Sequence, residues 1–135
     1  MTTMEQADAG EQADILIETE VSIQDRMWGD ANERADSENN QLLAAGLAQL
    51  IALNYRVHGD TGAFDTVPSV YPEGWDGFRD YGSNVANLVV AAAFIRSEIK
   101  RRILLGEDTT RAKRGEPYTT ATPYVSSEQA ASELL

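Results

Sequence analysis

The sequence predicts an all-α protein: a small helical bundle of three main helices, with a long ordered loop between the second and third and an extended C-terminal tail. Three segments place apolar residues at the three- and four-residue spacing of a helix, and glycine or serine stands near their ends. With 135 residues and a hydrophobic fraction of 42%, the chain is long enough for one domain with its own core. The expected organisation is a flexible N-terminus over residues 1–10, a helical domain over 11–106 and an extended or flexible tail over 107–135.

The first helix is expected to run from Glu11 to Met27. Gly29 follows it, and glycine is common just past a helix end because it adopts the left-handed backbone conformation at low cost. The apolar residues that fit the helical period are Ala13, Leu16, Ile17, Val21, Ile23 and Met27.

The second helix is expected to begin near Ser37, a good N-cap residue, and to end near Val57. Leucine and isoleucine cover nearly all of its sides, which is typical of a central helix, so Leu47 and Leu50 are expected to be nearly inaccessible. A group of small residues would let a neighbouring helix approach closely: Ala44, Ala45, Gly46 and Ala48.

The third helix is expected to start near Ser83 and to end before Gly106. Glu98 and Arg102 are four residues apart, the spacing of an ion pair on a helix surface. The helix carries a clean apolar stripe: Val85, Leu88, Val89, Ala92, Ile95, Ile99 and Ile103.

The segment from Gly59 to Gly82 contains five aromatic residues, which favour an ordered loop that packs against the helices. Loops of this length are usually either functional or disordered. Within it, Trp75 is interpreted either as an anchor of the loop or as a partner-binding aromatic.

Composition excludes several classes of function. The chain has no cysteine and one histidine, so it has no disulfides, thiolate metal sites or multi-histidine centres. No apolar run is long enough for a membrane span, and no membrane association or signal peptide is expected. The net charge of −11 argues against direct nucleic-acid binding, which needs a dominant basic field. We expect a cytoplasmic protein of a bacterial or phage-infected cell, or a virion component.

The charge is unevenly distributed along the chain. Residues 1–40 hold eleven acidic residues against two arginines, a balance of −9, whereas seven of the eleven basic residues lie between Arg96 and Arg114. This polarity permits the acidic end of one subunit to pair with the basic end of another, and it also permits a metal–phosphate site. Asp30, Glu33 and Asp36 recur every third residue, so they either line one face that holds Mg²⁺ or form an ordinary solvated helix start.

The stretch ETEVSIQDRMWGDANERADSENNQLLAAGLAQL, followed by NLVVAAAFIRSEIKRR, resembles small phage-borne relatives of the MazG-like, all-α NTP pyrophosphatases. The shared features are Gln24 near the end of the first helix, the pair Trp28-Gly29, a polar acidic linker, an apolar helix and an Ala-rich helix that ends in Glu and basic residues. The resemblance covers about residues 15–105, with the long loop as an insert.

The resemblance implies a four-helix core completed by dimerisation or higher assembly, and Mg²⁺-dependent cleavage of a (d)NTP to (d)NMP and pyrophosphate. It also implies an acid pair on each of two helices as metal ligands. This chain departs from that pattern, because amides occupy most of the corresponding positions. The residues at the expected positions are Asn39, Asn40 and Gln41 for the first pair, and Asn84, Asn87 and Val90 for the second.

If the chain is such a nucleoside triphosphate pyrophosphohydrolase, the carboxylates near those positions would hold the metal. The candidate Mg²⁺ ligands are Glu18, Glu33, Asp36 and Glu38. The candidate nucleotide-binding residues are Trp28, Asn39, Asn87, Arg96 and Lys100. Trp28 is interpreted alternatively as closing a core edge, and the asparagines as helix-terminal amides. The alternative function is a non-catalytic helical binding protein or a virion or assembly component, and in either case we expect a homo-oligomer.

Overall fold

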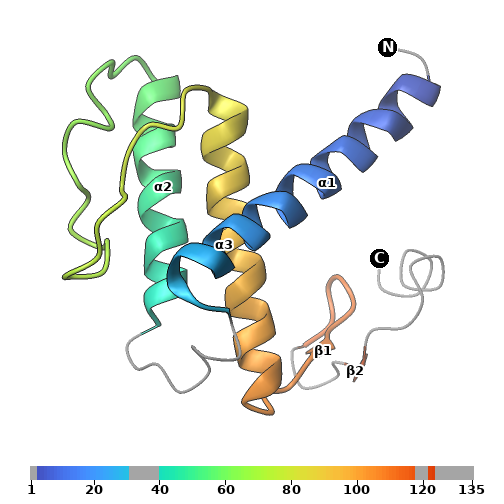
Figure 1. Ribbon diagram of the computed structural model, residues 1–135. Coiled ribbons are helices and arrows are strands. Elements are labelled where there is room, and N and C mark those ends of the chain that lie inside the picture. Colours follow the sequence, from blue (N-terminus) through green and yellow to red (C-terminus); the bar gives the residue numbers. More distant parts are fainter. Residues whose placement is uncertain (1–2, 31–39, 118–121, 124–135) are drawn as a thin grey trace. The chain divides into compact units, whose positions relative to one another are not determined.

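The computed structural model describes residues 3–30, 40–117 and 122–123, and it confirms the all-α fold class (Figure 1). Helix α1 spans Thr3–Trp28, α2 spans Gln41–Val57 and α3 spans Asn84–Leu104. The strands β1 (Thr110–Arg111) and β2 (Thr122–Pro123) form a short antiparallel ladder in which Thr110 lies opposite Pro123. The chain divides into two compact units, Met1–Arg102 and Ile103–Leu135, and the first contains the core.

Helix α1 begins at Thr3, so the predicted start near Glu11 was too late. The first residues, TMEQADAG, are mostly good helix formers but carry no periodic apolar face, and apolar periodicity was the signal used to place the start. The predicted end is confirmed, because Gly29 adopts a φ of 82° and its N–H donates to the Asp25 carbonyl at 2.9 Å.

Helix α2 begins at Gln41, so the prediction of Ser37 as its N-cap was wrong. The N-cap is Asn40, whose φ of 51° and ψ of 44° lie in the left-handed region rather than the helical one. Asparagine tolerates this conformation better than other non-glycine residues. Its side-chain oxygen also accepts hydrogen bonds from Arg101 (3.0 Å) and Arg102 (3.1 Å), which fixes the residue in place.

Helices α2 and α3 lie antiparallel in close contact. The start of α2 meets the end of α3 through Asn40 and Arg101, and Arg56 near the end of α2 meets Asn84 at the start of α3 (Figure 1). Gly46 permits the approach, because a Cβ there would lie 3.3 Å from the Ala91 carbonyl oxygen. This confirms that the small residues of the second helix let a neighbouring helix come close.

The leucines of α2 are distributed differently from the prediction. Leu47 is 44% exposed and Leu50 only partly buried, so the expectation that both would be nearly inaccessible was wrong. The inward face of α2 is instead made largely of small side chains, and its larger apolar residues point partly outward. The buried residues of this helix are Leu42, Ala45, Gly46, Ala48, Gln49, Ala52 and Leu53.

The loop between α2 and α3 packs onto the core, as its aromatic content predicted. Tyr71 is buried, and Trp75, Phe78 and Tyr81 pack against the cluster formed by the two helices. The buried apolar cluster consists of Leu42, Ala45, Ala48, Tyr71, Val90 and Phe94.

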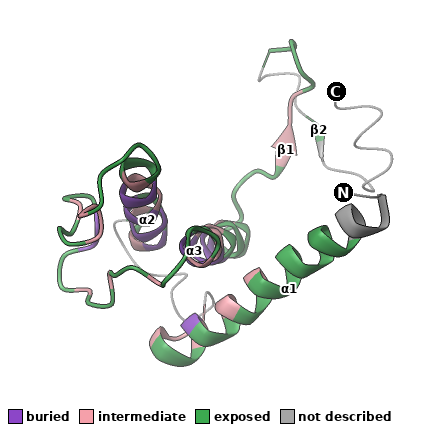
Figure 2. Cartoon of the chain, turned by 90° about the horizontal axis from the view of Figure 1, so that it is seen from above, coloured by how far each residue is buried: buried purple, intermediate pink, exposed green. Residues whose placement is uncertain are grey.

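The apolar stripe of α3 does not face this core. A stripe of that kind normally packs inward, but Val85 is 60% exposed and Ile99 is 54% exposed. The opposite face is buried, and it is mixed in character: Asn87, Val90, Ala91, Ala93, Phe94, Ser97, Glu98 and Arg101. Helix α1 is also exposed along most of its length, with Gln24 as its buried residue among the described side chains (Figure 2).

Candidate functional site

The two amide positions singled out in the sequence are both engaged within the chain. Asn87 is fully buried, and its Nδ2 donates to Asp80 Oδ1 and to the Ser83 carbonyl, each at 2.9 Å. Its Oδ1 accepts from the Tyr81 N–H at 3.0 Å. Asn87 therefore fastens the end of the long loop to α3, which accounts for its burial without a nucleotide.

Asp80 is the centre of this attachment. It accepts hydrogen bonds from Asn87, from the Gly82 N–H at 3.0 Å and from the Arg56 guanidinium. The hydrogen bond from Asn87, followed by those from Gly82 and Arg56, lowers the pKa of the Asp80 carboxyl below its ordinary value. Arg56 also donates to Asn84 Oδ1 at 3.0 Å, so the amide of Asn84 is engaged as well.

At the other end of α3, Asn40, which is itself exposed, binds the arginines of a charge cluster. Glu98 is 4% exposed and Arg101 6% exposed, and Glu98 accepts from Arg101 and from Arg102. The Arg102 Nε–Glu98 Oε2 distance of 3.2 Å confirms the predicted i,i+4 ion pair. Burial raises the pKa of Glu98, but the hydrogen bonds and charges of Arg101 and Arg102 outweigh it, and the net pKa is lowered.

The structure does not bring the two amide positions together. Asn40 contacts α3 at Arg101, whereas Asn87 lies fourteen residues earlier on the same helix. At a rise of 1.5 Å per residue this is about 21 Å along the axis. A single metal ion bound at one position is therefore out of reach of the other.

The proposed metal ligands are only partly within the described residues. Glu33, Asp36 and Glu38, together with Asn39, lie outside them. Glu18 is exposed on α1. Over residues 3–30, 40–117 and 122–123, no three acidic or histidine side chains gather closely enough to hold a metal ion.

Trp28 takes part in an aromatic stack that joins three segments. Its ring centroid lies 5.9 Å from that of Phe94 on α3 and 6.3 Å from that of Trp75 in the loop. Gly77 completes the contact, since a Cβ there would lie 3.3 Å from Trp28 Cζ2. These contacts agree with the interpretations of Trp28 as closing a core edge and Trp75 as a loop anchor.

The two cationic candidates, Arg96 and Lys100, are exposed on α3. Arg96 is nine residues after Asn87, and Lys100 is four further on, so they do not converge on the amide. The three predicted nucleotide-binding residues of α3 are thus spread along the helix.

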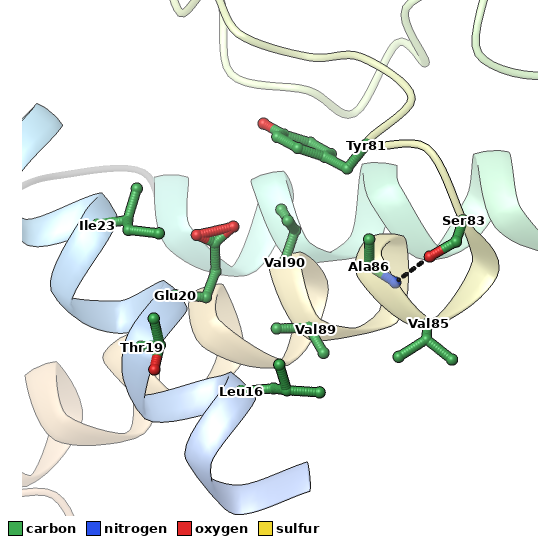
Figure 3. Close-up of a pocket in the computed structure, with 10 residues that line it drawn as sticks. All are labelled: Leu16, Thr19, Glu20, Ile23, Tyr81, Ser83, Val85, Ala86, Val89 and Val90. Carbon is green, nitrogen blue, oxygen red and sulfur yellow. Dashed lines mark hydrogen bonds between the residues drawn. The ribbon is translucent and has the colours of Figure 1, made fainter. Parts of the chain in front are cut away.

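The structure instead shows a groove between α1 and α3, which we call the α1–α3 groove. It comprises two hollows of about 400 and 410 Å³ that share Leu16, Val85 and Val89. Figure 3 shows the first hollow, in which the Glu20 carboxylate lies among apolar side chains. The first is lined by Leu16, Thr19, Glu20, Ile23, Tyr81, Ser83, Val85, Ala86, Val89 and Val90. The second is lined by Ala9, Gln12, Ala13, Leu16, Ile17, Val85, Leu88, Val89 and Ala92.

Glu20 is the one carboxylate of the groove lining. Burial raises the pKa of Glu20, and the charge of Arg79 opposes that effect in part. Sequence reasoning missed this residue, because a single glutamate on an acidic helix carries no signal of its own. The apolar stripes of the first and third helices were visible in the sequence, but not the fact that they face each other across an open groove.

Comparisons with protein-family models, with curated proteins and with solved structures gave no significant match. None of the described helices is both long enough and apolar enough to cross a membrane.

Proposed function

We propose that this chain is a non-catalytic helical assembly protein, which binds another helix in the α1–α3 groove. The observation that carries the proposal is the exposure of large apolar side chains on both walls of the groove, including Leu16 at 46% and Leu88 at 48%. A contiguous apolar surface of this kind marks an interaction site in a monomer. A second helix bound there would remove this apolar surface from water, which is favourable and which the folding of one chain does not achieve.

The distribution of polar groups supports a binding role. Two of the amides that the resemblance places at the metal-ligand positions, Asn40 and Asn87, hold the loop and the helix ends together. Asn87 binds Asp80 and the Tyr81 backbone, and Asn40 binds Arg101 and Arg102. Their part in the fold is explained by these bonds.

We expect the wild-type chain to self-associate and the Leu88→Asp variant to sediment near the 14.8 kDa chain mass at micromolar concentration. A carboxylate in the groove would be desolvated without a partner, which strongly disfavours docking. Leu88 lies outside the core, so the melting temperature measured under monomeric conditions should change little. The matched control is Leu47→Asp, which alters an exposed leucine on α2. A wild-type chain that sediments as a monomer would contradict the proposal.

A second candidate is Mg²⁺-dependent hydrolysis of a (d)NTP to (d)NMP and pyrophosphate. It is favoured by the end of α1, where Trp28 and Gly29 stand as the resemblance to the pyrophosphatases requires, directly before the acidic segment. Glu18 alone does not make a metal site, so the ion would depend on Glu33, Asp36 and Glu38. Arg96 and Lys100 would bind the phosphates of the nucleotide.

Melting curves with Mg²⁺, alone and with a non-hydrolysable triphosphate, test this candidate. A bound ligand raises the melting temperature by mass action, and Asp36→Asn or Glu38→Gln should abolish the rise while leaving the fold intact. Pyrophosphate release over the common NTPs and dNTPs gives the independent readout. If neither Mg²⁺ nor the triphosphate shifts the melting curve, and no pyrophosphate is released, the hydrolase candidate fails.

A further inference from the structure

The exposed stripe of α3 has the spacing of a helix-pairing seam. Its residues are separated by three, four, three and four positions, the alternation that keeps apolar side chains against one partner helix. Four of the five lie on the side of α3 opposite the buried face that carries Val90 and Phe94. The fifth, Ile95, is partly buried at the edge of the stripe, where a Cβ at Gly46 of α2 would lie 3.3 Å from it. The seam consists of Val85, Leu88, Ala92, Ile95 and Ile99. A stripe of this spacing fits a second α-helix better than a small molecule.

One flank of the seam carries both a wall of the groove and a cation. Val89 and Arg96 are seven residues apart, so they share a face of α3 two turns from each other. Val89 lies beside Glu20 in the first hollow, whereas Arg96 is exposed farther along the helix (Figure 3). An acid on α1, Glu20, thus lies beside this flank at one place, and a base, Arg96, lies on the flank at another, outside the two hollows.

We propose that the occupant of the groove is α3 of a second copy of this chain, packed antiparallel about a two-fold axis near Ala92. In that register Val85 of each copy lies opposite Ile99 of the other. Arg96 of each copy lies opposite Leu88 of the other, one residue before Val89, and its side chain is on the flank that faces Glu20. The proposal rests on the assembly function above and specifies its partner and its geometry.

Charge complementarity is the argument for a second copy over an unrelated helix. The partner helix must carry apolar residues at the seam spacing and a cation that reaches Glu20, and α3 itself has both. Arg79 of the same chain reduces the cost of burying Glu20 only in part, since burial still dominates the pKa of Glu20. A two-fold axis makes the contact occur twice, because each copy supplies one Glu20 and one Arg96.

Charge reversal tests the pairing. Glu20→Arg and Arg96→Glu, each alone, place like charges at both contacts of the homodimer and should weaken self-association on the order of tenfold or more. An equimolar mixture of the two variants should form a heterodimer with affinity near that of the wild type. In that heterodimer one contact is native and the other is the reversed pair. Glu11→Arg and Lys113→Glu are exposed positions outside the seam that make the same charge changes, and they should not show this mutual rescue.

Cross-linking gives a second measurement that does not depend on charge. The chain has no cysteine, so Ala92→Cys introduces a single thiol on the proposed axis, where it should form a disulfide with the same residue of the other copy. Leu47→Cys, on an exposed position of α2, should not cross-link. Melting curves of every variant show that it is folded.

These experiments test the antiparallel arrangement of the dimer separately from the assembly function. If the wild-type chain self-associates but the mixture of Glu20→Arg and Arg96→Glu shows no rescue and Ala92→Cys does not cross-link, the antiparallel arrangement is overturned and the assembly function stands. A wild-type chain that remains monomeric overturns both.

Discussion

Replacing Phe94 by alanine is expected to lower the free energy of unfolding by about 3–5 kcal/mol, the range for removing a buried aromatic ring. Phe94 is 2% exposed; its ring stacks on Trp28 and lies at a tilt to Trp75, with centroids 6.3 Å apart, so it joins α3 to the end of α1 and to the loop. Gly46 places the backbone of α2 against the Phe94 Cβ, which leaves little freedom for the helices to collapse into the space.

Urea unfolding measures this effect, and Tyr55→Ala provides the matched control. Tyr55 is 59% exposed on α2, so truncating its ring should cost less than about 1 kcal/mol. If Phe94→Ala cost no more than Tyr55→Ala, the aromatic stack would not be the centre of the core.

Replacing Arg101 by methionine is expected to cost about 3–5 kcal/mol, because it leaves the Glu98 carboxylate buried with its main partner removed. The variant also removes one of the two arginines that bind Asn40. The double variant Glu98→Leu with Arg101→Met should recover most of the loss, since a well-packed apolar pair replaces the buried ions. No recovery would mean that the ion pair itself, rather than an unpaired charge, determines the stability.

The pH dependence of unfolding checks the same pair. Folding lowers the pKa of Glu98, so its contribution to stability is present above the ordinary glutamate pKa of about 4.3. That contribution is lost as the pH falls through the lower, folded-state pKa. The double variant lacks the carboxyl and should lose less stability over this acid range than the wild type.

Much of the fold could be predicted from the sequence, because its signals are local. Ser83 caps the start of α3, since its Oγ accepts a hydrogen bond from the Ala86 N–H at 3.0 Å, and Gly29 ends α1 as expected. The aromatic loop was identified as ordered because five large rings cannot be left in water without cost. The start of α2 was missed because the left-handed Asn40 is stabilised by two arginines about sixty positions later in the chain.

Which face of each helix is buried was harder to predict than where the helix begins and ends. Periodicity shows that a helix has an apolar stripe, but not whether that stripe meets the same chain or another molecule. In α3 the close approach at Gly46 draws a face with Ala91 and Asn87 inward, and the larger stripe with Val85 and Leu88 stays exposed. The role of Asn87 was missed for a similar reason. The sequence marks it as an amide at an expected metal-ligand position, but its hydrogen-bond partner Asp80 lies in the loop, and the sequence does not show that contact.

The aromatic stack has a consequence for spectroscopy. Trp28 and Trp75 are the two tryptophans of the chain, and their rings lie 6.3 Å apart in the same cluster. At this separation their electronic transitions couple, so near-ultraviolet circular dichroism will contain a joint signal of the pair rather than two independent ones. Departure of the loop or of the end of α1 would abolish that signal, even with the other helices intact. The near-ultraviolet tryptophan signal therefore measures how these segments come together rather than how much helix is present.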